Sequence, residues 1–204
     1  MKPLKFIHIT KCAGTTIEKL GKKKNINWGM YDKEYGSNWH GIFPNVREDV
    51  KLKYDWFMVV RNPYERLISE FYCNFKGVKN LKQSHKLSNN YFNQYIKKHI
   101  IERSYRGNHY TEQYKYLDDN KNIKIHIIHF ENIEIEFMKL MKKYNIDIRF
   151  DEHHNSCRVK KKFTIESFDP EVLELINEVY HLDFVKFGYK KIIVDRKKIN
   201  KEDT

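Results

Sequence analysis

Apolar positions along the chain fall into short continuous runs that alternate with segments of helical spacing, which predicts an α/β fold. Buried strands are expected at the start of residues 5–18 (KFIHITKCAGTTIE), over residues 54–60 (YDWFMVV) and over residues 123–130, with a further short strand over residues 25–28. Because helical segments separate them, these strands are expected to form a mostly parallel central sheet with helices on both faces. A ligand would then lie at the carboxyl-terminal ends of the strands.

The predicted helices follow these strands. The best-defined one begins at Asn62 and Pro63, because asparagine caps a helix and proline suits its first turn, and it is expected to continue until Gly77. Other helices are expected over residues 15–23, 90–102 and 131–144, from a start within residues 44–53, and from residue 170 to about residue 180. The polar segments are expected to be loops, at residues 31–45, 77–89 and 151–163.

Length, charge and composition narrow the classes of protein. The 204 residues suit one domain at residues 1–190, followed by a charged tail at residues 191–204. A net charge of +12 indicates an anionic partner. Because no apolar run approaches the roughly 20 residues that span a bilayer, we expect a soluble protein without a signal peptide or membrane anchor. The odd number of cysteines and the lack of an N-x-[ST] site favour a cytoplasmic location. No metal is predicted, because the three cysteines lack metal-binding spacing: Cys12, Cys73 and Cys157.

The first candidate chemistry lies in residues 5–18. A strand that runs into a glycine-containing turn and a helix start directs unpaired N–H groups and the positive end of a helix dipole to one point. A phosphate-like or sulfate-like anion would lie over Gly14, Thr15 and Thr16; the alternative is an ordinary turn with a capping threonine. A Walker loop has its lysine after the second glycine, whereas Lys11 precedes Gly14. An ordinary kinase or ATPase is therefore disfavoured.

Two segments carry a resemblance to a known family. The order K-x-x-G-T-T directly after a strand resembles the 5′-phosphosulfate loop of sulfotransferases that use 3′-phosphoadenosine 5′-phosphosulfate (PAPS), although Thr10 replaces the usual proline. The segment VVRNPYERLISEFY resembles the family's 3′-phosphate segment, in which an arginine at a strand end and a serine eight positions later bind that phosphate. Arg61 and Ser69 match these positions. Arginine suits the role because its planar fork binds phosphate oxygens bidentately.

Other segments resemble the family in pieces up to Tyr189. The segment GNHYTEQYKYL is similar to the H-x-x-x-Q-x-x-x-L pattern of the glycan sulfotransferase branch that includes uronosyl 2-O-sulfotransferases, with His109 and Gln113 in the matching places. The basic loop at residues 151–163 corresponds to a family loop over the adenosine and 3′-phosphate. The resemblance implies phosphate contacts from this loop, with a solvated basic turn as the alternative, at Arg158, Lys160, Lys161 and Lys162.

The resemblance implies a fold similar to that of P-loop kinases and transfer of a sulfuryl group from PAPS to a hydroxyl. The product would be adenosine 3′,5′-bisphosphate, and no metal would take part. Lys11 would neutralise the charge that develops on the bridging oxygen, while loop N–H groups hold the 5′-phosphate. The donor would be bound by the loop residues Lys11, Cys12, Ala13, Gly14, Thr15 and Thr16.

The acceptor hydroxyl needs a general base, and His40 is predicted for this role. A neutral imidazole accepts a proton near physiological pH, and glycan members of the family place a histidine or a glutamate in this region. Some members carry H-G-H where this chain has His40-Gly41-Ile42. If the second histidine of that pattern is essential, Glu34 or His109 becomes the candidate.

The positive charge and the loop aromatics favour a glycan acceptor, which can be anionic. Trp39 would stack on a sugar, and His40, His109 and Gln113 would complete the acceptor site. A tyrosyl or small-molecule hydroxyl is the alternative acceptor. A basic nucleic-acid-binding protein is the alternative of another class, and it would bind DNA or RNA in a salt-sensitive way and ignore adenosine 3′,5′-bisphosphate. The sequence makes no prediction of the oligomeric state.

Overall fold

The computed structural model describes residues 1–34, 40–73, 77–78, 81–102, 108–150 and 160–194. The chain divides into two compact units. The first comprises Met1–Arg61 and Tyr105–Ser156, and the second comprises Asn62–Ser104 and Cys157–Thr204. Within the described part of the chain, no helix is both long and apolar enough to cross a membrane.

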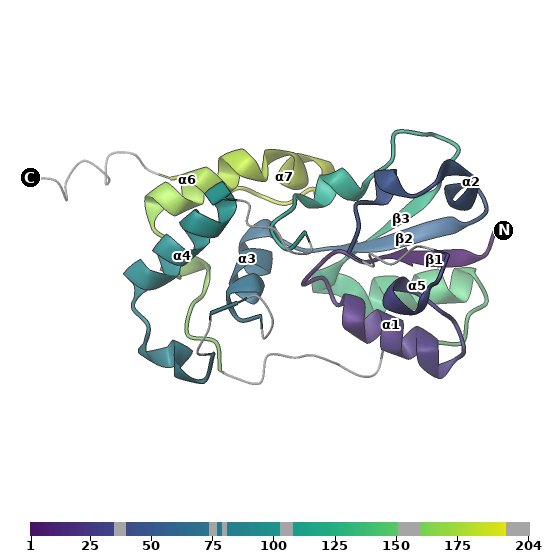
Figure 1. Ribbon diagram of the computed structural model, residues 1–204, viewed down its shortest axis with the longest axis horizontal. Helices are drawn as coiled ribbons and strands as arrows, with labels where there is room; N and C mark the ends of the chain where they lie inside the picture. The colour runs from purple at the N-terminus through teal and green to yellow at the C-terminus, as the bar shows by residue number, and fades with distance from the viewer. Residues whose placement is uncertain (35–39, 74–76, 79–80, 103–107, 151–159, 195–204) are drawn as a thin grey trace, which may run out of the picture. The chain divides into compact units, whose positions relative to one another are not determined.

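The first unit is built on a parallel sheet. Its described strands follow the order β1 (Leu4–Ile7), β2 (Asp55–Val60) and β3 (Ile125–His129). The helices α1 (Gly14–Lys23) and α5 (Ile133–Lys143) lie along the same side of this sheet (Figure 1). The predicted α/β fold with a parallel sheet and flanking helices is confirmed.

The central strand β2 is buried along its whole length, which explains its continuous apolar sequence. Successive side chains point to opposite faces of the sheet. On one face Phe57 contacts Phe137 of α5, with ring centroids 6.1 Å apart. On the other face Trp56 contacts Phe43, at 4.8 Å, in the 3₁₀ helix η2 (Phe43–Asn45). Aromatic side chains therefore fill the core on both sides of the sheet.

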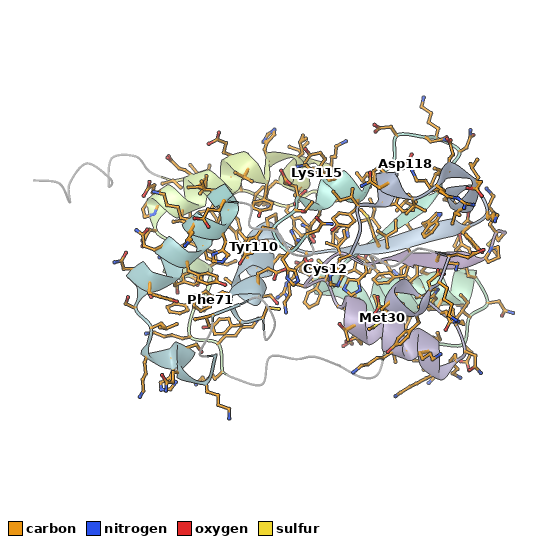
Figure 2. All side chains as sticks on the ribbon, in the orientation of Figure 1. Cys12, Met30, Phe71, Tyr110, Lys115 and Asp118 are labelled. Carbon is orange, nitrogen blue, oxygen red and sulfur yellow. The ribbon has the colours of Figure 1, made fainter. Side chains whose placement is uncertain are left out.

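Short helices complete the first unit. They are η1 (Gly29–Tyr31), α2 (Glu48–Lys51), η4 (Gln113–Tyr116) and η5 (Phe130–Asn132). Lys51 of α2 donates to Asp118 at 2.6 Å, and both side chains are about nine-tenths buried. Figure 2 labels Asp118. Burial raises the pKa of Asp118, but hydrogen bonds from Lys51 and the Asn120 N–H outweigh it, so the net shift is downward.

The second unit is helical. Its elements are α3 (Pro63–Phe71), η3 (Leu81–Lys86), α4 (Asn89–Glu102), η6 (Ile165–Ser167), α6 (Pro170–Val179) and α7 (His181–Phe187). Phe92 stacks on Phe163 at 4.5 Å, and Phe71 meets both rings edge-on. The Asn62 side chain accepts from the Tyr64 N–H at 3.0 Å, so the predicted cap at the start of α3 is confirmed.

Two element predictions were wrong because the chain turns sooner than its pattern indicates. Residues 25–28 form no strand: Asn25 is left-handed (φ 59°), and the Trp28 indole donates to the Leu4 carbonyl at 3.0 Å in the core. Helix α3 ends at Phe71 and does not reach Gly77. The Val78 N–H donates back to the Phe71 carbonyl at 2.9 Å, so the chain folds onto the last turn of α3.

Three other segments differ from their predicted form. The helix expected within residues 44–53 is divided between η2 and α2. The loop expected over residues 77–89 contains η3. The helix expected from residue 170 to about residue 180 matches α6, but residues 181–187, for which no separate helix was predicted, form α7.

Candidate active site

The loop between β1 and α1 is bent by two left-handed residues. Lys11 and Ala13 both have a φ of 61°, a conformation that residues other than glycine seldom adopt. The Ala13 carbonyl accepts the N–H of Thr16 at 3.0 Å. The N–H groups of Gly14 and Thr15 come before this point, so the helix offers them no carbonyl acceptor. The first turn of α1 therefore has the donors that an anion needs.

The side chains of this loop divide into inner and outer ones. Cys12 is fully buried, and its thiol donates to the Gln113 side-chain oxygen at 3.4 Å (Figure 2). Thr16 is also buried. Lys11 and Thr15 are partly exposed. An anion at the loop would therefore meet the side chains of Lys11 and Thr15, and the backbone of the buried residues.

A buried histidine lies directly beneath the loop. The ring of His8 is so close to Gly14 that a Cβ added to this glycine would lie 2.3 Å from the His8 Nε2. The His8 Nδ1 lies 2.6 Å from the Glu18 Oε1, and both side chains are almost completely buried. Sequence reasoning missed this pair. Its signal was the four-residue spacing of Gly14 and Glu18, which puts both on one face of α1.

Three histidines lie side by side at the carboxyl-terminal end of the sheet, where β1 ends. The His40 ring is edge-on to His8, with centroids 4.6 Å apart, and to His109, with centroids 5.8 Å apart. The His40 carbonyl accepts from the Asn108 side chain at 2.8 Å and from the Tyr116 hydroxyl at 3.2 Å. His40 itself is partly exposed. The predicted base is thus held by its backbone next to the loop, although it is distant from the loop in sequence.

Gln113 connects the end of β2 to the loop. This fully buried side chain accepts from the Arg61 N–H and donates to the Arg61 carbonyl, both at 2.8 Å. Its oxygen also accepts from the Cys12 thiol. The amide is therefore engaged with the protein itself. This arrangement favours a positioning role over the direct acceptor contact expected for Gln113.

Arg61 lies where β2 ends, and its guanidinium extends to the loop. Its Nη1 donates to the Lys11 carbonyl at 3.4 Å, and the guanidinium carbon lies 4.1 Å from the centre of the Phe130 ring. The side chain is 9% exposed. A planar guanidinium held against a ring in this way keeps its charge and fork geometry in a fixed place. The two predicted phosphate-binding positions, Lys11 and Arg61, therefore adjoin in the first unit.

The remaining candidates belong to the second unit or lie outside the described residues. Ser69 is on α3 and partly exposed, eight positions after Arg61 as predicted. Lys160, Lys161 and Lys162 are exposed, and the Lys162 ammonium donates to the Leu87 carbonyl at 2.6 Å. Trp39 and Arg158 lie outside the described residues.

Glu34, the alternative base, lies with Tyr54 and Lys5 and not next to the three histidines. Its carboxylate accepts from the hydroxyl of Tyr54, the residue before β2, and lies 3.8 Å from the Lys5 ammonium of β1. This position is toward the amino-terminal ends of the strands. The Tyr54 hydrogen bond lowers the pKa of Glu34 and raises the pKa of Tyr54 to about 12. A carboxylate with a lowered pKa is a poor proton acceptor.

Comparison with known proteins identifies the family. A family model described as "Sulfotransferase family" matches residues 2–190, a span that includes every candidate site residue. Neither a curated protein nor a solved structure matches the chain.

Proposed function

Because the chain belongs to the sulfotransferase family, we propose that it transfers a sulfuryl group from PAPS to a hydroxyl of a glycan. In this in-line displacement the acceptor oxygen forms a bond to sulfur while the bond from sulfur to the 5′-phosphate oxygen breaks. The electron pair of the broken bond goes to that bridging oxygen, and the hydroxyl proton goes to a base. Such a reaction needs positioning and charge neutralisation more than covalent help.

The observation that carries the proposal is the contact between Arg61 and the Lys11 carbonyl. Residues 50 positions apart place a guanidinium, an ammonium and the donors of a helix N-terminus around one loop. This donor set suits a ligand with two separate phosphate groups, because each charged end has its own cation or N–H groups. We assign the 5′-phosphosulfate to residues 11–16 and the 3′-phosphate to Arg61. Ser69 is proposed for the same phosphate by resemblance alone.

Lys11 has the chemistry for the leaving group. Its ammonium can neutralise the charge that grows on the bridging oxygen only as the sulfur–oxygen bond breaks. Cys12 contributes backbone and not thiol chemistry in this assignment, because its side chain is buried against Gln113. Lys160, Lys161, Lys162 and Arg158 are proposed as further contacts on the 3′-phosphate side, by resemblance alone.

His40 is the proposed general base. A partly exposed imidazole can accept a proton from an entering hydroxyl and release it to solvent. Its fixed backbone supports this role because a base must be held within hydrogen-bond reach of the proton. Trp39 and His109 are assigned to the acceptor, and Gln113 to the support of Arg61. A glycan acceptor is favoured by the net charge of +12.

The donor part of the proposal is tested by ligand binding to the wild-type protein. We expect adenosine 3′,5′-bisphosphate to raise the unfolding midpoint more than 5′-AMP does, because only the bisphosphate has the second anionic end. ATP with Mg²⁺ is the control for a kinase-like site. Equal stabilisation by bisphosphate and 5′-AMP would refute the 3′-phosphate assignment. Salt-sensitive binding of DNA without any response to the bisphosphate would favour the nucleic-acid alternative.

The acceptor is tested by transfer of label from ³⁵S-PAPS to a panel of acceptors. The panel contains uronic-acid glycans, neutral glycans, a tyrosine-containing peptide and a small phenol. Label in a glycan fraction alone is expected. Label in the peptide or the phenol alone would replace the glycan with the alternative acceptor class and leave the donor assignment intact.

A further inference from the structure

The pair formed by His8 and Glu18 occupies space that two glycines leave open. A Cβ on Gly14 would lie 2.3 Å from the His8 Nε2, and a Cβ on Gly29 would lie 1.7 Å from the Glu18 Oε1. Gly29 also has a φ of 54°, which favours glycine. Real Cβ atoms do not approach other atoms so closely, so both glycines are required by the bulk of the pair.

Burial of Glu18 costs desolvation free energy. Its side chain is fully buried. Its Oε1 lies 2.6 Å from the His8 Nδ1 and accepts a hydrogen bond from the Met30 N–H at 3.1 Å. Within the described residues its Oε2 has no hydrogen-bond partner. An apolar pair of the same size would fill this space without that desolvation cost. Because stability alone does not favour an acid here, the pair calls for a functional explanation.

The pair lies between two elements of the proposed site. On one side the His8 ring supports Gly14 at the start of α1, and on the other it meets the edge of His40 at 4.6 Å. The bond between Glu18 and the His8 Nδ1 fixes the plane of the imidazole ring, because the ring cannot turn without breaking it.

We propose that His8, held by Glu18, is a positioning residue that forms the floor of the donor loop and orients the imidazole of His40. This inference rests on the proposed function, because it assigns His8 as a common support for the proposed donor site and the proposed base, His40. His8 touches neither donor nor acceptor in this scheme. Its effect is geometric, and displacements of about 1 Å at reacting groups can cost on the order of 10²-fold in rate.

The floor is tested by a double-mutant cycle between His8→Asn and Gly14→Ala. The asparagine side-chain nitrogen can replace Nδ1 in the bond to Glu18, but asparagine lacks the ring atoms nearest Gly14. Gly14→Ala alone is expected to weaken binding of adenosine 3′,5′-bisphosphate by about tenfold or more, because its Cβ meets the His8 ring. His8→Asn added to Gly14→Ala should recover about threefold or more of that loss. Additive losses would overturn the inference.

If Gly14→Ala does not fold, the double-mutant cycle is measured by the unfolding transition instead of by ligand binding. A double variant that recovers a cooperative unfolding transition supports the floor, and one that stays unfolded counts against it. His8→Phe is the second probe, because it keeps the ring but loses the nitrogen bonded to Glu18. It should lower the unfolding midpoint more than His8→Asn does, and the reverse order would contradict the role of Glu18.

The contact between His8 and His40, on which the orientation of His40 depends, is tested by NMR of the His40 imidazole signals, without any ligand. These signals should shift in His8→Asn, because the ring 4.6 Å away is lost. The matched control is His126→Asn, which removes a partly buried, hydrogen-bonded imidazole at the other end of the sheet. Unchanged His40 signals in His8→Asn would overturn the inference.

Different outcomes would refute the proposed function and the role of His8. If the wild type does not bind the bisphosphate, the proposed function fails, whereas the NMR shift and the coupling in stability still report on His8. If the wild type binds the bisphosphate but Gly14 and His8 act additively, only the role of His8 fails.

Discussion

Both ends of the sheet carry histidines bonded to acidic or hydroxyl groups, yet they are built differently. At the amino-terminal end His126 of β3 lies 2.8 Å from the Tyr144 hydroxyl, which donates to Asp55 of β2 at 2.6 Å. At the carboxyl-terminal end His8 is bonded to Glu18 below the start of α1. The first network ties the end of α5 to two strands. The second is next to a helix N-terminus, a lysine, an arginine and two more histidines.

This difference teaches that a buried histidine network is not by itself a sign of catalysis. The amino-terminal network joins residues whose partners are all parts of the framework. At the carboxyl-terminal end the strands deliver side chains to the loops, and those loops carry N–H donors and cations. Mutations at the carboxyl-terminal end should therefore change activity, whereas mutations at the amino-terminal end should change stability.

The largest effect is expected from His40→Ala. We expect kcat to fall by about 10²–10⁴-fold with bisphosphate binding retained, because the mutation removes the proton acceptor and leaves the donor loop. The acidic limb of the kcat profile should also vanish. Steady-state kinetics over pH with the glycan found by the acceptor screen measures both. His126→Ala is the control. A His40→Ala protein that keeps its rate and its acidic limb would transfer the role to His109, whose ring lies next to His40.

Lys11→Ala is expected to lower kcat by roughly 10²-fold or more, with a smaller change in bisphosphate affinity. The ammonium acts on charge that appears only as the bond breaks, so the loss falls on the chemical step. Kinetics at saturating PAPS and calorimetry with the bisphosphate separate the two terms. Lys24→Ala, which removes an exposed lysine paired with Asp147, is the matched control. EDTA should leave the activity of the wild type intact.

Arg61→Ala is expected to weaken bisphosphate binding by about 2–4 kcal/mol, because it removes a charge-assisted bidentate contact. Binding of 5′-AMP should change much less. Calorimetry with both ligands measures the selectivity, and Arg47→Ala, an exposed arginine paired with Asp49, is the control. An equal loss for both ligands would indicate that Arg61 supports the loop through Lys11 and does not recognise the 3′-phosphate.

At the other end of the sheet, Tyr144→Phe should act on stability alone. Asp55 is buried and loses its hydroxyl donor, so the free energy of unfolding should fall by about 1–3 kcal/mol. Urea denaturation measures this loss, and the bisphosphate affinity of the folded protein should equal that of the wild type. A loss of affinity would mean that the amino-terminal network contributes to the site.

The smallest effect is a pH dependence at the same network. Burial, followed by the charges of Lys143 and Lys124, lowers the pKa of His126 below its usual value. The unfolded chain then binds more protons than the folded one as the pH falls through the usual pKa of about 6.5, so the contribution of His126 is present above that pH and lost below it. Between pH 7.5 and pH 5.5 the wild type should lose more unfolding free energy than His126→Asn. Parallel curves would contradict the assigned shift.

The sequence by itself determined the parts of this protein that depend on neighbouring residues. The apolar run before Arg61 predicts a buried strand, and Asn62 with Pro63 predicts the start of α3, because capping and burial patterns are local. In the same way, a strand followed by Lys11 and Gly14 predicts an anion loop, because the donors belong to one turn. The places of Lys11 and Arg61, each after a strand, follow from these local patterns, whereas their roles in phosphate binding stay predictions.

Only the tertiary structure decided which distant side chains support that site. Gln113 bonds to Arg61 across 52 positions and to Cys12 across 101, so no local pattern reveals that it holds the strand to the loop. In the sequence His8 looks like an ordinary residue next to a strand. Only in the folded chain does α1 place Glu18 and Gly14 against its ring. The end of α3 at Phe71 and the course of residues 25–28 were decided by packing as well. Burial and close approach are properties of the folded chain, because they arise only when separate segments exclude water from one another.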